Sequence, residues 1–131
     1  MNKTGFVCTH VYGSEKELVT DFFGADFDED CVEIIFQTNG AVVLVEEEDL
    51  DSIDTTKDGQ TIIIFRVYET SMAFSISCYK DGKMLYEMSS HDGQAFIQEG
   101  NLGSLQDREL ETSSLFSKIL EDTGIDVWEV L

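Results

Sequence analysis

The stretch that decides the fold is Thr61-Ile-Ile-Ile-Phe-Arg-Val-Tyr-Glu69, followed after Thr70-Ser71 by Met72-Ala-Phe-Ser-Ile-Ser-Cys-Tyr-Lys80. Both runs are rich in β-branched and aromatic residues, which favour extended strands. In the second run, apolar residues at 72, 74, 76 and 78 alternate with more polar ones, so one face is expected to be buried. Because the turn between the runs is short, the sequence predicts two antiparallel strands.

Further turns extend this sheet in both directions. Asp81-Gly82 and Asn39-Gly40 are dipeptides that accept positive φ angles, and each predicts a tight hairpin. The strands expected around these turns and near the chain ends are Phe6 to Tyr12, Cys31 to Gln37, Ala41 to Glu46, Lys83 to Ser89 and Ile125 to Val130. The Gly- and Gln-rich stretch His91 to Gln106 is expected to be a loop, with a helical turn around Ala95 to Gln98.

Two helices are expected to cover the sheet. Ser14 and Glu17 form a capping box, and Gly24 is placed to end the helix in a left-handed conformation. The apolar face of this first helix consists of Leu18, Val19, Phe22 and Phe23. A second helix is expected from about Asp107 to Asp122, stopped by Gly124. Its inward residues are Leu115, Phe116, Ile119 and Leu120.

The parts assemble into one domain covering residues 1–131. The chain has no proline and no internal repeat, and 42% of its residues are hydrophobic. We expect an α+β fold, an antiparallel β-meander sheet with two main helices packed on one face. The number of cysteines is odd, and all three, Cys8, Cys31 and Cys78, lie in apolar strand-like stretches. Reduced thiols in the cytoplasm are therefore expected. No segment reaches membrane-spanning length.

Charge is the main functional clue. The chain carries 27 acidic residues against 8 basic ones, a formal net charge of −19. Such a surface repels anionic lipids and nucleic acid, whereas it attracts a basic protein. Direct binding to a membrane or to nucleic acid is therefore not expected.

The acidic residues gather in two clusters that we predict to bind a partner. The denser tract consists of Glu46, Glu47, Glu48, Asp49, Asp51 and Asp54. The second cluster consists of Asp26, Asp28, Glu29 and Asp30. The alternative interpretation of the dense tract is a solvated turn between strands. The second cluster has the first ligand spacings of a calcium loop, but Cys31 and Gln37 replace its essential Gly and Glu, so no metal is expected.

Other chemistry-bearing residues are better explained by structure. Cys8 and His10 share a strand face, with His91 as the other imidazole, but no further pair gives metal-ligand or catalytic spacing. We therefore expect neither an enzyme nor a cofactor. Arg66 is expected to form an ion pair with an acid, with anion binding as the alternative. Trp128 is either a lid on the core or an interface anchor.

In size, charge and lack of a catalytic motif, the chain resembles the small acidic immunity proteins of bacterial toxin systems. The resemblance rests on the two acidic clusters and on composition. It implies an inhibitor that occludes the active or substrate-binding surface of a basic toxin such as a nuclease. The alternatives are a nucleic-acid mimic that inhibits a DNA-binding protein, an adaptor or subunit of a larger assembly, and a small Cys/His enzyme.

Overall fold

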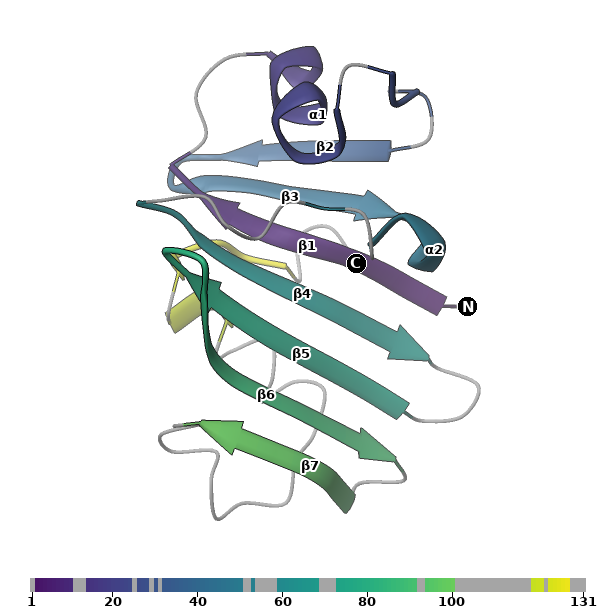
Figure 1. The fold of residues 1–131 in the computed structure, drawn as a ribbon, viewed down its shortest axis with the longest axis vertical. Coiled ribbons are helices and arrows are strands. Elements are labelled where there is room, and N and C mark those ends of the chain that lie inside the picture. Colours follow the sequence, from purple (N-terminus) through teal and green to yellow (C-terminus); the bar gives the residue numbers. More distant parts are fainter. Residues whose placement is uncertain are drawn as a thin grey trace.

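The computed structural model describes residues 2–10, 14–24, 26–28, 30, 32–50, 53, 59–68, 73–91, 94–100, 119–121 and 123–127 (Figure 1). The elements are β1 Asn2–Thr9, α1 Glu15–Phe23, β2 Val32–Gln37, β3 Gly40–Val45, α2 Glu47–Leu50, β4 Thr61–Tyr68, β5 Ala73–Lys80, β6 Lys83–His91 and β7 Gln94–Gly100. Residues 119–121 and 123 are also helical. Among the residues so described, no helix has the length and apolar content that crossing a membrane requires.

All seven strands belong to one antiparallel sheet in the order β2-β3-β1-β4-β5-β6-β7 (Figure 1). The predicted α+β class and the central pairing of β4 with β5 are confirmed. β4 to β6 form a meander as expected, which β7 extends, whereas β1 lies between this meander and the β2–β3 hairpin. Among the strands that the structure describes, β2 and β7 are therefore the two outer ones.

The two predicted tight turns have different outcomes. Asp81 and Gly82 both have positive φ angles, 52° and 79°, and connect β5 to β6 as expected. The β2–β3 turn lies one residue earlier than predicted, because Gln37 pairs with Gly40 and the loop residues are 38 and 39. Gly40 instead begins β3, where a Cβ atom would overlap the Cys8 carbonyl oxygen. Close packing of β3 on β1 therefore explains this glycine.

The two faces of the sheet carry separate apolar clusters. Phe6, Cys8, Val43 and Ile64 lie on one face, and the α1 residue Leu18 packs with them. The opposite face carries a second cluster, whose members include Val7, Val42, Ile63, Phe65, Ile76, Cys78, Ile119, Ile125 and Val127. The alternation of side chains along β1 separates Phe6 from Val7 in this way.

The helix arrangement differs from the sequence-based expectation in one respect. α1 and α2 share a face of the sheet, since Leu18, Phe22 and Leu50 belong to the same cluster. The expected second main helix is described only at 119–121 and 123, and Ile119 packs on the opposite face. Leu120 is exposed, in contrast to its predicted inward position. The remainder of that helix, including Leu115 and Phe116, lies outside the described residues.

The predicted positions of the two ends of α1 are confirmed, but the conformation of Gly24 differs from the predicted one. The side chain of Ser14 accepts a hydrogen bond from the backbone N–H of Glu17 at 3.3 Å. Gly24 caps the other end with a φ of 102° and a ψ of 164°, so its φ is positive but its conformation is extended rather than left-handed helical. Leu18, Val19 and Phe22 are buried, and Phe23 packs partly buried beside them.

Residues near the C-terminus are held by side chains of the β2–β3 hairpin. Gln37 donates from Nε2 to the Asp126 carbonyl oxygen at 2.7 Å and accepts from the Asp126 N–H at 2.8 Å. Asn39 donates to the Gly124 carbonyl oxygen at 3.1 Å. Residues 125–127 are not a strand, which corrects the expected strand at Ile125 to Val130 over its described part. Gln37 supplies the hydrogen bonds that a strand neighbour would otherwise provide.

β7 corrects a second expectation. Gln94–Gly100 pairs with β6, although the sequence predicts a loop with a helical turn there. Polar residues are common on outer strands, and pairing with β6 overrides the weak local preference. Phe6 to Tyr12 is also only partly confirmed, because β1 ends at Thr9 and His10 adopts a positive φ of 55°. Val11 and Tyr12 lie outside the described residues.

Candidate functional site

The strand register brings the two acidic clusters to one corner of the sheet. Val32 at the start of β2 pairs with Val45 at the end of β3. Asp30 lies two positions before Val32, and Glu46 directly follows Val45. Figure 1 shows the segment before β2 and the beginning of α2 at the same end of the β2–β3 hairpin. We call Asp26, Asp28, Asp30, Glu46 and Glu48 the acidic corner.

The dense tract sits on a short helix anchored in the core. Leu50 is only 2% exposed and packs with the cluster beneath α1, and Ile53 packs partly buried beside it. Glu46 and Glu48 are exposed, and Asp49 is half-buried. Leu50 and Ile53, three positions apart, therefore anchor this segment to the core while Glu46 and Glu48 face water.

The second cluster is also fixed to the scaffold. Asp26, Asp28 and Asp30 are exposed. Asp28 accepts a hydrogen bond from the Asp30 N–H at 3.0 Å, which stabilises a local turn. Phe27 stacks on Phe23 of α1 with ring centroids 4.3 Å apart. The stacked ring holds the segment against α1 while the flanking carboxylates remain in solvent.

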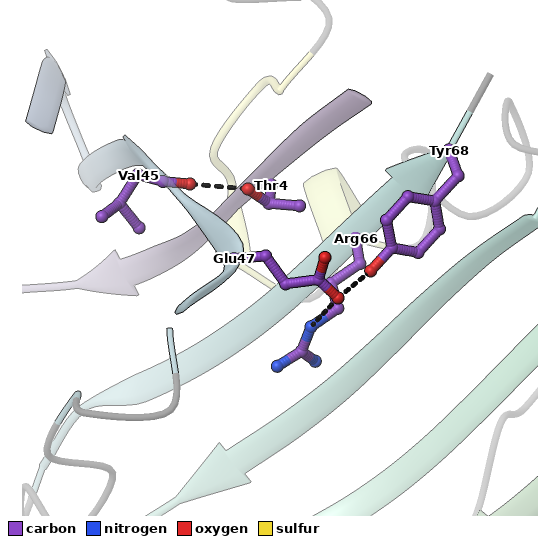
Figure 2. A network of polar contacts seen from close by, with 5 residues as sticks. All are labelled: Thr4, Val45, Glu47, Arg66 and Tyr68. Atoms are coloured by element: carbon purple, nitrogen blue, oxygen red, sulfur yellow. Dashed lines mark hydrogen bonds and ion pairs between the residues drawn. The ribbon is translucent and has the colours of Figure 1, made fainter. Parts of the chain in front are cut away.

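Glu47 has a different role from its neighbours. It accepts a hydrogen bond from the Tyr68 hydroxyl, and its Oε1 lies 3.8 Å from Nε of Arg66 (Figure 2). In the same view, the Thr4 hydroxyl donates to the Val45 carbonyl oxygen at 2.6 Å. These contacts tie α2 and the end of β3 to β1 and β4. Arg66 forms the ion pair expected from the sequence, so Glu47 is a structural residue of the site.

Burial of Tyr68 and its hydrogen bond to Glu47 affect the phenol. The pKa of Tyr68 is raised from 10.0 to about 12, and desolvation is the largest cause. The hydrogen bond to Glu47 and the charge of Glu47 raise the pKa further, whereas the charge of Arg66 lowers it. The phenol is therefore a stable hydrogen-bond donor at neutral pH. It helps to fix the position of α2.

The other predicted residues fall into two groups. Asp51, Asp54 and Glu29, together with Cys31 and Trp128, lie outside the described residues. Cys8 and His10 lie among the described residues and differ in burial. Cys8 is fully buried, its thiol donates to the Ala41 carbonyl oxygen at 3.9 Å, and burial raises its pKa from 9.0 to about 12. His10 is exposed on the bend after β1.

Two of the three cysteines lie among the described residues. Cys8 and Cys78 are free, buried thiols, as the sequence predicts. Within the described ranges, no three His, Cys, Asp or Glu side chains gather closely enough to hold a metal ion.

The sequence shows both acidic clusters but does not show that they lie close together in the fold. The signal that could have joined them is the β2–β3 hairpin itself, since its ends must meet when its two-residue turn forms. The role of Phe27 and the Glu47–Tyr68 contact depend on tertiary packing that local patterns do not encode. No protein-family model, curated protein or solved structure matches the chain.

Proposed function

We propose that the chain is an acidic protein-binding inhibitor that engages a basic partner through the acidic corner. The observation that carries this proposal is the meeting of two separate acidic clusters, exposed on elements with apolar anchors, at one end of the β2–β3 hairpin. Clustered charge of one sign steers encounter with a surface of opposite sign. A rigid base means that little ordering is needed on binding.

The class of partner follows from the same physics. A toxin that acts on nucleic acid presents positive charge to phosphates, and carboxylates on a rigid scaffold can occupy that surface. We propose an immunity protein that occludes a basic toxin such as a nuclease. The five carboxylates of the acidic corner are gathered at one end of a hairpin, and this arrangement favours a local docking surface over a mimic of an elongated nucleic acid.

The test is a comparative affinity capture with matched charge variants. The corner variant carries Asp30→Asn, Glu46→Gln and Glu48→Gln. The control variant carries Glu17→Gln, Glu87→Gln and Glu121→Gln, which removes the same charge from other elements. A basic protein retained by wild type and control but lost by the corner variant supports the proposal. Equal retention by both variants would place the binding surface elsewhere.

A further inference from the structure

The outer strand β2 has one side along which no other described strand pairs. β2 is the first strand in the sheet order and pairs only with β3 among the residues that the structure describes. The two-residue turn closes on the Gln37–Gly40 pair, so Gln37, Ile35 and Glu33 exchange hydrogen bonds with β3. The N–H and C=O groups of Val32, Ile34 and Phe36 therefore point away from the sheet.

β2 has few of the features that protect an outer strand from pairing. Proteins commonly block such edges with Pro, Lys or a β-bulge. β2 is Val-Glu-Ile-Ile-Phe-Gln, and its register with β3 has no shift. Phe36 is 43% exposed, one of the larger exposed apolar side chains in the described part of the chain. None of these three features therefore blocks the outward main-chain groups of β2.

The charge around β2 selects the occupant. The acidic corner lies at the Val32 end of the strand, and the exposed Glu33 lies on the face opposite to Phe36. A second copy of this chain would bring the same charge to the edge, on a molecule that already carries −19. An extended segment with basic residues meets opposite charge instead.

We propose that β2 is a docking edge to which an extended basic segment of the partner adds as a further antiparallel or parallel strand. This inference rests on the proposed function and names the mode of binding at the same corner. Main-chain hydrogen bonds to Val32, Ile34 and Phe36 supply affinity, and alternate side chains supply specificity.

The two faces of the added strand meet different surroundings. Val32 and Ile34 pack partly buried against the cluster beneath α1, and Figure 1 shows α1 beside β2 at this edge of the sheet. Apolar residues of the added strand extend this cluster and cover Phe36. Its basic residues point to the other face, where a lysine opposite Glu33 forms a cross-strand pair. The preferred segment therefore alternates apolar and basic residues.

Proline at position 36 tests the role of the main chain. Phe36→Pro removes a donor that points away from β3, so the pairing of β2 with β3 is retained. Phe36→Val is the matched control, because it removes the aromatic ring but keeps the N–H and strand preference. Circular dichroism and thermal melting establish that both variants are folded. Ile34→Pro, which removes the next outward N–H, is the second test if Phe36→Pro fails to fold.

The probe is a short peptide of alternating lysine and valine, compared with a peptide of the same composition in block order. We expect the alternating peptide to bind wild type and Phe36→Val, with on the order of tenfold weaker binding or more to the proline variant. Amide exchange should slow at Val32, Ile34 and Phe36 when it binds.

Two outcomes would overturn the docking edge. One is equal binding of the alternating peptide to wild type and the folded proline variant, and the other is no binding to wild type. If the alternating peptide binds wild type and the proline variant equally but does not bind the corner variant, strand addition is wrong and the proposed function stands. Failure of the proposed function is detected separately, by equal capture of a basic protein with the corner and control variants.

Discussion

At the scale of single residues, carboxylates in one tract have different roles. Glu46 and Glu48 face solvent, whereas Glu47 binds Tyr68 and lies beside Arg66. Sequence position alone does not separate them, because all three are adjacent acids. A charge-neutralising experiment on the corner must therefore leave Glu47 in place, since its loss would also loosen α2.

Tyr68 provides a titration test of this distinction. Its folded-state pKa of about 12 lies above the ordinary 10.0, so the neutral phenol stabilises the fold. This contribution is fully present below pH 10 and is lost as the pH rises through about 12. We expect Glu47→Gln to lower the midpoint, because it removes the Glu47 charge and replaces a charged hydrogen-bond acceptor with a neutral one. Absorbance of tyrosinate, with Tyr68→Phe as the subtraction control, measures this shift, and an unchanged midpoint would contradict the contact.

Cys8 provides a second residue-scale prediction. Because burial raises its pKa to about 12, the thiolate is scarce at neutral pH, and the side chain is also inaccessible. We expect iodoacetamide at about pH 8 to leave Cys8 unmodified in the folded protein and to alkylate it in urea. Peptide mass spectrometry locates the modification. Rapid labelling of Cys8 in the native state would show that β1 opens readily.

At the scale of elements, the β4–β5 and β5–β6 hairpins were predictable, whereas the position of β1 and the pairing of β7 were not. The turn chemistry of Asp81-Gly82 and the strand character of Thr61 to Tyr68 are local properties, and both are confirmed. β1 lies between β3 and β4 because of pairing between strands that are far apart in the sequence, and no local pattern predicts such pairing. β7 was missed for the same reason, because its pairing with β6 outweighs a loop-like composition.

The acidic site shows the same division. Its residues and the anchoring by Leu50 follow from the sequence, since apolar residues spaced among acids must face the core. The meeting of the two clusters follows only from the Val32–Val45 register. The free edge of β2 was not foreseen, because the position of a strand in the sheet order is a property of the whole topology.

The contact between β2 and residues 124–127 gives an element-scale prediction. Gln37→Ala removes two hydrogen bonds to Asp126, at 2.7 and 2.8 Å. We expect the free energy of unfolding to fall by about 1–3 kcal/mol, because partly buried backbone groups lose their partner. Urea denaturation measures the change, with the exposed Thr38→Ala as control. A loss no larger than that of the control would show that apolar packing of Ile125 and Val127 alone holds this segment.

At the scale of the whole molecule, net charge opposes the compact state. With 27 acids and 8 basic residues, the folded chain concentrates repulsion that salt screens. The Debye length falls from about 30 Å at 0.01 M salt to about 10 Å at 0.1 M. We therefore expect sodium chloride in this range to raise the free energy of unfolding by roughly 1 kcal/mol.

Magnesium chloride at matched ionic strength is the control for this salt effect. General screening predicts similar stabilisation by both salts, with a modest extra effect of the divalent cation. Saturable stabilisation by magnesium at micromolar concentration would instead indicate a specific cation site. A decrease in stability with sodium chloride would contradict the importance of self-repulsion.

The central claim is that the acidic corner steers a basic partner to this protein. Its most direct test is the association rate of the captured basic partner, measured by stopped flow with the corner and control variants at several salt concentrations. We expect the corner variant to associate several-fold more slowly than the control at about 0.01 M salt, and the difference to vanish near 1 M, where the Debye length is about 3 Å. Equal association rates of the two variants at every salt concentration would contradict the account.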